Sequence, residues 1–310
     1  MKSYFFKRLA WVIPMLFMVS LLSFSLMSLS PSDPAEVALR VNDITVTPEA
    51  LLQMRQELGL DQPFYTRYFQ WLKGVFQGDL GMSYALKTPV LHEILSALKT
   101  TLLLGVCALF LVVVFGFGLG IVCAVYEGSM VDKIVRFIVF ITTAMPSFWL
   151  GLLLVWLFSL YFNLLPTSGF EAWYSLILPS ITLSLNYLST YARMMRNTML
   201  QTKEALFVLY AKARGLSSVV IYQHIIKNAL RPCIIALGMS IPKLLAGTVV
   251  VENIFGLPGI GRLCVHAIFS RDIPMIQAYV FLMASLFILF NLTADMVVRY
   301  LDPRLRHALE

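Results

Sequence analysis

The sequence predicts an all-helical protein that crosses a membrane several times. Hydrophobic residues make up 59% of its 310 residues and charged residues only 13%, whereas soluble domains carry roughly 25% charged residues. Several apolar runs reach the length of about 20 residues that a helix needs to cross a bilayer. The Lys and Arg residues fall mainly between these runs, as expected when charge follows membrane topology.

Six segments are long and apolar enough to be spans. They cover residues 9–29, 101–126, 134–165, 174–195, 229–251 and 276–298. The third segment is longer than a simple crossing requires, so it has room for a tilt or for a turn at the interface.

The first segment has some features of a secretory signal. Lys2, Lys7 and Arg8 form a positive start, and small residues follow the apolar run at Ser28 and Ser30. The apolar run is longer than the roughly 7–15 residues of a signal peptide. We therefore expect an uncleaved membrane anchor.

The positive charges predict the orientation. With the N-terminus in the cytoplasm, most basic residues near span ends also fall inside, and the short outside loop after the third span has no Lys or Arg. The basic residues placed inside are Lys2, Lys7, Arg8, Lys133, Arg136, Arg193, Arg196, Lys203, Lys212, Arg214, Lys227, Arg231, Arg299, Arg304 and Arg306. Both termini are predicted to be cytoplasmic. The net charge of +7 then reflects topology, and no nucleic-acid partner is expected.

The chain divides into three predicted parts. Residues 1–29 form the cytoplasmic N-terminus and the first span, and residues 30–100 form an external insertion that reads as a small mixed domain. Residues 101–310 form the core, with spans two to six and a polar, basic inside loop at 196–228.

Local signals place helices in the external insertion. Thr47-Pro48 predicts a helix start with proline at the first helical position, and Gly59 predicts its end. A second, aromatic helix is expected after Pro63. Asp33-Pro34 predicts a turn out of the membrane, and Gly78-Asp79-Leu80-Gly81 predicts another turn.

No enzymatic site can be built from the sequence. It lacks the G-x-x-x-x-G-K-[ST] phosphate loop, the G-x-S-x-G elbow and the H-E-x-x-H metal motif. The four cysteines and four histidines form no CxxC pair or cluster, so no structural metal site is expected. Fifteen methionines are ordinary fillers of apolar interiors. Any energy from ATP must therefore come from a partner.

The inside loop carries the most informative pattern, at Ala211-Lys212-Ala213-Arg214-Gly215-Leu216-Ser217. A short helix with small residues forms a knob that seats in another protein's groove, and Gly215 can provide a left-handed helix end. An interfacial helix that binds anionic lipid through Lys203, Lys212 and Arg214 fits the spacing equally well.

Together with motifs along nearly the whole chain, this loop resembles the permease subunits of ABC importers, in the form of the dipeptide/oligopeptide/nickel family. The loop matches the family's EAA motif at Ala211, Ala213, Gly215, His224, Asn228, Ala229, Leu230 and Pro232, although Leu209-Tyr210-Ala211 replaces the Glu-Ala-Ala triplet. Further motifs that match are Leu58-Gly59-Leu60-Asp61-Gln62-Pro63, Ala144-Met145-Pro146-Ser147-Phe148-Trp149, Leu165-Pro166-Thr167-Ser168-Gly169, Val251 to Gly261, Arg271 to Gln277 and Asp302-Pro303-Arg304.

The resemblance implies a type I ABC importer transmembrane domain in the bacterial inner membrane. It implies four kinds of partner: a second homologous permease, two cytoplasmic ATPases that bind ATP and Mg, an external substrate-binding protein, and the bilayer. This chain itself would need no cofactor and hold no metal. The ATPases would dock on Ala211, Lys212, Ala213, Arg214, Gly215, Leu216 and Ser217. An outer-mouth motif would comprise Glu252, Phe255, Pro258, Gly259 and Gly261.

Polar residues within spans are candidates for the pathway. Lys243 follows Pro242, where a kink is expected, and it either lines the pathway, pairs with Asp295 or extends to an interface. Glu252 either attracts a cation at the outer mouth or makes a hydrogen bond at the helix end. Asn186 and Asp295 are candidates for the pathway or for contacts between helices. Gly116 to Gly120 is expected to be a helix-packing face.

The substrate follows only from overall similarity, which favours nickel or a metal chelate of the opine or histidine type. A di- or oligopeptide is the alternative. A secondary transporter remains a candidate from another class. Such a transporter would be expected to show repeated, broken helices, and the docking loop at 196–228 argues against it.

Overall fold

The computed structural model describes residues 2–29 and 33–301, with side chains for 10–29 and 33–297. The described residues are helical, and their one β-bridge joins Met82 to Pro89. The chain forms two compact units. Unit 1 comprises residues 1–101 and 258–289, and unit 2 comprises residues 102–257 and 290–310. The motif Asp302-Pro303-Arg304 and the basic residues Arg304 and Arg306 lie outside the described residues.

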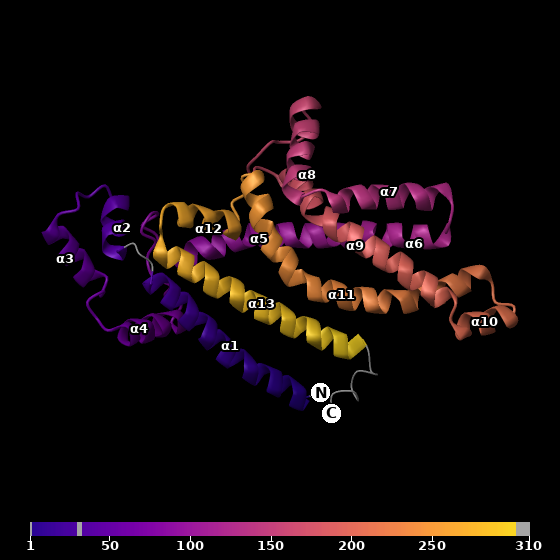
Figure 1. Ribbon diagram of the computed structural model, residues 1–310, viewed down its shortest axis with the longest axis horizontal. Coiled ribbons are helices and arrows are strands. Elements are labelled where there is room, and N and C mark those ends of the chain that lie inside the picture. The colour runs from indigo at the N-terminus through magenta and orange to yellow at the C-terminus, as the bar shows by residue number, and fades with distance from the viewer. Residues whose placement is uncertain (1, 30–32, 302–310) are drawn as a thin grey trace. The chain divides into compact units, whose positions relative to one another are not determined.

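Unit 1 contains the first span and the external insertion. Its helices are α1 (Lys2–Ser28), α2 (Pro34–Val41), α3 (Pro48–Glu57), α4 (Phe64–Phe76), the start of α5 (Val90–Leu111), α12 (Ile260–Phe269) and most of α13 (Ile273–Leu301). α4 packs along α1 (Figure 1). Tyr68 joins them, because its hydroxyl lies 2.8 Å from that of Ser20 and its ring lies 5.5 Å from that of Phe24.

The insertion is helical, not mixed. Thr47 caps α3 by accepting a hydrogen bond from the Ala50 amide at 3.2 Å, and Gly59 follows the helix with φ of 63°. Both boundaries were predicted. At Asp33-Pro34 the expected turn is instead a helix start, since Asp33 caps α2 and Pro34 occupies its first position.

α5 begins at Val90, well before the span predicted from residue 101. Its first turns bury Val90, Ile94 and Ala97 on one face, and Val90 and Ile94 pack with Ala267 of α12. The other face carries His92, Glu93, Ser96 and Lys99 beside Leu95, so hydropathy alone misses this amphipathic extension.

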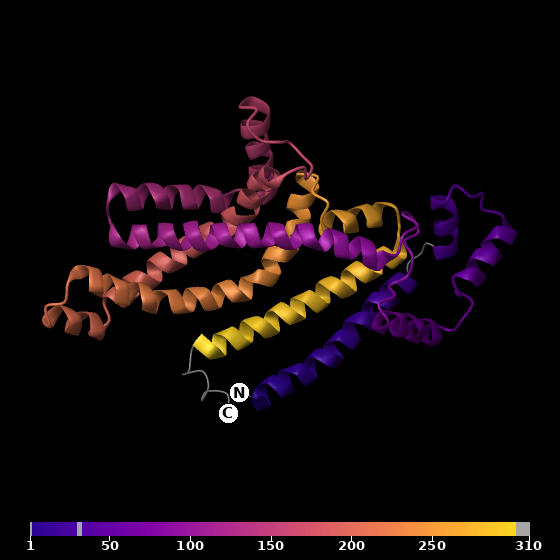
Figure 2. The ribbon, with the colours of Figure 1, turned by 180° about the vertical axis from the view of Figure 1, so that it is seen from behind.

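Unit 2 is a bundle around one central helix, α9 (Ile177–Lys203). Its other elements are the end of α5, η1 (Val112–Phe117), α6 (Gly118–Val125), α7 (Met130–Ala144), α8 (Ser147–Leu154), η2 (Val155–Tyr161), η3 (Trp173–Leu176), α10 (Leu206–Ala213), α11 (Ser218–Ile254) and the end of α13. η1 and η2 are π-helical turns within longer helices. α6 and α7 form a hairpin that both views show (Figures 1 and 2).

Four described helices are long and apolar enough to cross a membrane, and a bent pair adds a fifth. The bend of 108° separates α7 from α8 and η2 at Met145-Pro146, within the long third segment. Proline cannot continue α7 because it lacks the amide and disfavours a helical residue before it. α9 has 27 residues, so it is long enough for a sixth span, but it is more polar.

α11 extends from Ser218 through the predicted fifth span. Pro232 and Pro242 lie inside it without ending it, and the helix visibly bends along its length (Figure 1). Most of the predicted inside loop is therefore helix, consisting of the end of α9, α10 and the start of α11.

The glycine face of α6 and η1 meets α9 closely, as the sequence predicted. A Cβ at Gly120 would lie 2.7 Å from the Ala192 carbonyl oxygen and 2.7 Å from the Met195 Cβ. A Cβ at Gly118, two residues earlier, would meet nothing within 4 Å. Only one side of this segment therefore requires glycine.

Replacing Gly120 with alanine should push α6 away from α9. We expect Gly120→Ala to lower the free energy of unfolding by about 1–3 kcal/mol, because overpacking against backbone cannot relax easily. Thermal unfolding of the purified chain in detergent measures this. Gly118→Ala is the matched control and should leave stability unchanged or raise it, since alanine favours helix by up to about 1 kcal/mol. Equal effects of the two substitutions would contradict the proposed packing role.

Candidate functional site

The candidate site is the segment that joins α9 to α11, with α10 at its centre. α10 buries one side only: Val208 is 1% exposed and Ala211, one turn later, is half-buried. Both pack against a core cluster formed with α9 and α11. Residues three apart share a helix face, so this spacing attaches α10 along a single line and leaves the rest of it free.

Gly215 ends α10 in the left-handed cap that the sequence predicted. Its φ is 75°, its amide donates to the Lys212 carbonyl at 2.9 Å, and the Leu216 amide donates to the Ala211 carbonyl at 3.2 Å. This pair of bonds is the Schellman motif. It turns the chain sharply into α11, which begins after Ser217.

The outward side of the segment is both apolar and basic. Leu206 is 83% exposed and Tyr210 is 65% exposed. The Arg214 guanidinium lies 5.7 Å from the centre of the Tyr210 ring, a cation–π distance. The predicted docking residues with exposed side chains are Lys212, Ala213, Arg214, Leu216 and Ser217. A surface of this composition is suited to binding a partner.

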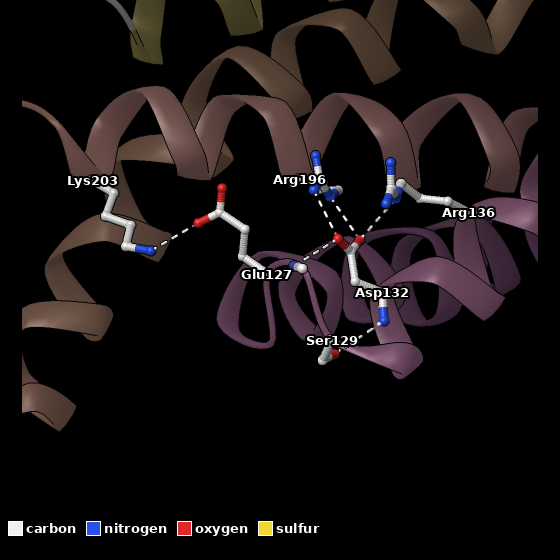
Figure 3. Close-up of polar contacts among 7 residues, drawn as sticks. Glu127, Ser129, Asp132, Arg136, Arg196 and Lys203 are labelled. Atoms are coloured by element: carbon white, nitrogen blue, oxygen red, sulfur yellow. Dashed lines mark hydrogen bonds and ion pairs between the residues drawn. The ribbon is translucent and has the colours of Figure 1, made fainter.

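A buried ion cluster fixes the helices near α10. Asp132 at the start of α7 is fully buried, and Arg196 of α9 binds its two carboxylate oxygens with two bonds of 2.9 Å (Figure 3). The Gly128 amide donates to it at 3.1 Å, and Arg136 approaches to 3.3 Å. A buried carboxylate costs free energy unless it is paired and hydrogen-bonded, and this one is both.

A second ion pair lies beside the cluster. Lys203, the last residue of α9, contacts Glu127 in the α6–α7 turn at 3.0 Å (Figure 3). This hydrogen bond raises the pKa of the Lys203 ammonium. The pair joins the α6–α7 turn to the residue from which the chain leaves for α10. The α6–α7 turn and α10 lie at the same end of unit 2 in both views (Figures 1 and 2).

The outer-mouth motif falls across the boundary between the units. In unit 2, Glu252 and Phe255 are buried, and the Phe255 carbonyl accepts a hydrogen bond from the Gly169 amide at 2.8 Å. In unit 1, Gly259 and Gly261 are buried and Pro258 is exposed. Glu252 is thus not open to solvent in this chain, and both roles expected of it stay predictions.

The intramembrane candidates differ in their exposure. Lys243 is exposed, and its pairing with Asp295 stays a prediction. The Asn186 side-chain oxygen is buried and has no hydrogen-bond partner among the described residues. A pathway role for these residues stays a prediction. Within the described residues, no group of three His, Cys, Asp or Glu side chains is placed to hold a metal ion.

Comparisons with known proteins agree with this architecture. Residues 1–105 match the N-terminal family of binding-protein-dependent transport system membrane components, and residues 116–307 match the binding-protein-dependent transport system inner membrane component family. A transmembrane chain of an inward-facing MetNI methionine ABC transporter has the same fold. Its TM-score is 0.56 at 18% identity, over 67% of this chain and 96% of that one.

Curated relatives align over almost the full length. The metal-staphylopine import system permease protein CntB of Staphylococcus aureus is 36% identical over 99% of both chains. The glutathione transport system permease protein GsiC of Pectobacterium atrosepticum is 38% identical over 99% of this chain and 100% of that one.

These matches and the helical bundle define the membrane-embedded part of an importer. The chain belongs to the family of binding-protein-dependent transport system inner membrane components. It is a permease subunit of an ABC importer of the peptide/nickel type, not an enzyme. The secondary-transporter alternative is therefore wrong.

Sequence reasoning named Arg136 and Arg196 only as topology signals and missed Asp132. No local pattern pairs Asp132 with an arginine 64 residues away. Only the packing of α7 on α9 brings them together.

Removing the buried charge should destabilise unit 2. We expect Asp132→Asn to lower the free energy of unfolding by about 3 kcal/mol, because Arg196 is then left unpaired. Thermal unfolding in detergent measures the loss. The double variant Asp132→Asn with Arg196→Met should recover part of it. Glu127→Gln breaks only the exposed pair and should cost under about 1 kcal/mol. A loss for Asp132→Asn as small as that control would contradict the role given to the cluster.

Proposed function

We propose that the chain forms one half of a translocation pathway, with a second homologous permease as the other half. Both termini lie in the cytoplasm in this arrangement. Two cytoplasmic ATPase subunits supply the energy and bind ATP and Mg, and an extracytoplasmic binding protein delivers the substrate. The absence of a phosphate loop in the sequence and membership of the binding-protein-dependent family support this division of labour.

The observation that carries the proposal is the one-sided burial of α10. Its exposed surface has no partner among the described residues although it bears Leu206, Leu209 and Tyr210. Docking of an ATPase would bury this apolar surface, and Arg214 would contribute a charged anchor of a type common at binding hot spots. A membrane-surface helix is the alternative interpretation of the loop.

The contacts of α10 give a route for movement. Val208 lies in one core cluster with Met195 and Met199 of α9 and with Ile221 and Ile225 of α11. Dense packing transmits displacement with little compression. α9 is in turn bound to α7 through Arg196 and Asp132. A displacement of α10 by the ATPases therefore reaches three long helices of unit 2.

Reversing the charge of the docking segment should uncouple the complex. We expect Arg214→Glu with Gly215→Glu to reduce substrate-stimulated ATPase activity at least about tenfold, since loss of one hot-spot residue costs on the order of 2 kcal/mol. The activity is measured in vesicles that contain both permeases, the ATPases and the binding protein.

Lys227→Glu is the matched control, because Lys227 is exposed on the same cytoplasmic loop but lies outside the segment. It should keep most of the stimulated activity. Normal stimulation in the Arg214 and Gly215 variant, with normal insertion, would refute docking at this segment.

For the substrate we propose a metal chelate of the opine or histidine type, or nickel released from one. Full-length similarity to a permease named for metal-staphylopine import supports this. A di- or oligopeptide is the second candidate, and the similarity to a glutathione permease supports it. The chain itself would bind no metal permanently, and the ion would cross as cargo.

Uptake in reconstituted vesicles distinguishes the candidates. We expect ATP-dependent accumulation of radiolabelled nickel in the presence of an opine or histidine chelator, at least about tenfold above that of a labelled dipeptide, which is a discrimination of about 1.4 kcal/mol. Nickel without a chelator tests whether the ion travels alone. Uptake of the dipeptide with no uptake of nickel in any form would overturn the metal assignment while leaving the ABC importer class intact.

A further inference from the structure

Unit 1 contains a cavity for which the sequence motifs predict no role. Its volume is about 450 Å3, within the range of roughly 300–1,000 Å3 typical of small-ligand pockets. It lies between the end of α1, helix α4, the 80–84 loop and the first turn of α13. The lining residues that matter below are Phe24, Arg67, Trp71, Tyr84, Pro274 and Gln277.

Two buried donors at this cavity have no acceptor. Gln277 is 6% exposed, and its side-chain Nε2 makes no hydrogen bond. The Nε of Arg67 is likewise buried without a partner. An unsatisfied buried donor costs about 1–3 kcal/mol, and native proteins rarely leave one without a reason. Arginine can only donate, and a glutamine amide can turn its donor toward the same place, so the missing partner is an acceptor.

The charge of the cavity favours an anion. Arg67 is the charged side chain among the described residues that line it, and its guanidinium lies 6.0 Å from the Phe24 ring centre. The nearby carboxylate of Asp272 does not line the cavity, because it is occupied by Ser83, by the Tyr84 and Ala85 amides at 3.2 Å and by the Met275 amide. Burial, and second the charge of Asp272, raise the pKa of Tyr84 to about 12, so Tyr84 stays a neutral phenol.

Apart from Ser28 and Gln70, the rest of the wall is mostly apolar, and it lies where spans end. Phe24, Met27 and Trp71 contribute apolar surface. Phe24 and Met27 belong to the last turns of the span Ala10–Ser28, and Gln277 belongs to the first turn or two of the span Ile273–Val297. With α1 running outward and α13 running inward, these ends meet at the outer interface. Lipid phosphates lie at this level, and Trp and Tyr side chains are enriched there.

We propose that this cavity binds the phosphate of a membrane phospholipid headgroup, with Arg67 and Gln277 donating to its oxygens and the apolar wall receiving the start of an acyl chain. An anion alone would use the two donors but not the wall, and a fatty hydrocarbon alone would leave both donors unsatisfied. A bidentate-capable guanidinium is well suited to a phosphate. A lipid bound there would hold α4 of the insertion against α1.

Binding of lipid to the purified, delipidated importer complex, with this chain at full length, tests the proposed phospholipid site. The probe is 1-palmitoyl-2-oleoyl phosphatidylglycerol, and native mass spectrometry counts the bound molecules per permease. We expect at least about tenfold weaker binding in Arg67→Gln, because a hydrogen bond to a charged group contributes about 1.5–3 kcal/mol. Gln277→Leu should weaken binding too, and without lipid it should melt no lower than wild type, since it removes a buried unsatisfied donor.

Lys73→Gln is the matched control, because Lys73 is exposed on α4 and does not line the cavity. Its lipid binding should equal that of wild type. Unchanged binding in both Arg67→Gln and Gln277→Leu would overturn the proposal. Inorganic phosphate and glycerol phosphate form the second arm. If either displaces the lipid at millimolar concentration in wild type but not in Arg67→Gln, the cavity is a site for a soluble anion, and the lipid assignment is wrong.

Discussion

α9 is too polar to face lipid along its length, so the other helices of unit 2 must cover it. Its buried residues include Ser180, Thr182, Ser184 and Ser189. Polar groups in a bilayer are satisfied only by protein or by enclosed water. α6, η1, α7, α8 and α11 all pack against it, and the absence of a Cβ at Gly120 allows the closest of these approaches. The positions of these five elements are thus set by their contacts with α9.

At the end of α9 from which the chain leaves for α10, an ion pair joins α9 to a neighbouring helix. Arg196 extends from α9 to a carboxylate on α7 that is fully buried, so both helices depend on one ion pair. Low local dielectric makes such a pair strong while it is intact and costly when either partner is lost. The hydroxyls of Thr142 on α7 and Ser189 on α9 lie 2.6 Å apart and join the same two helices two to three turns away. α7 and α9 are therefore held together at two depths.

Hydropathy predicted the helices that face lipid and was least informative for α9. α1, the α5–α6 region, α11 and α13 follow from their apolar runs, and proline and glycine marked the start and end of α3. Helix ends were harder to predict, because the first turns of α5 are amphipathic and α11 continues through two prolines.

For the candidate site, the left-handed helix end at Gly215 could be predicted from the sequence, because glycine adopts a positive φ without steric cost. The outward exposure of Tyr210 and Arg214 agrees with the predicted docking role without testing it. The Asp132 cluster, and the cavity around Arg67 and Gln277, combine residues from distant parts of the chain. No single stretch of sequence predicts either feature, because only tertiary packing brings their residues together.

The π-turn η1 has a consequence for how this chain can vary. A π-turn holds one more residue than the α-helical turn it replaces, and each residue of a helix advances it by about 100°. A deletion of one residue at η1 can therefore be absorbed by its conversion to an ordinary α-helical turn, which keeps Gly120 facing α9. A deletion in a purely α-helical stretch cannot be absorbed in this way and would rotate every later side chain by about 100°. In homologous chains, length should therefore vary more readily at η1 than in the α-helical parts of the same spans.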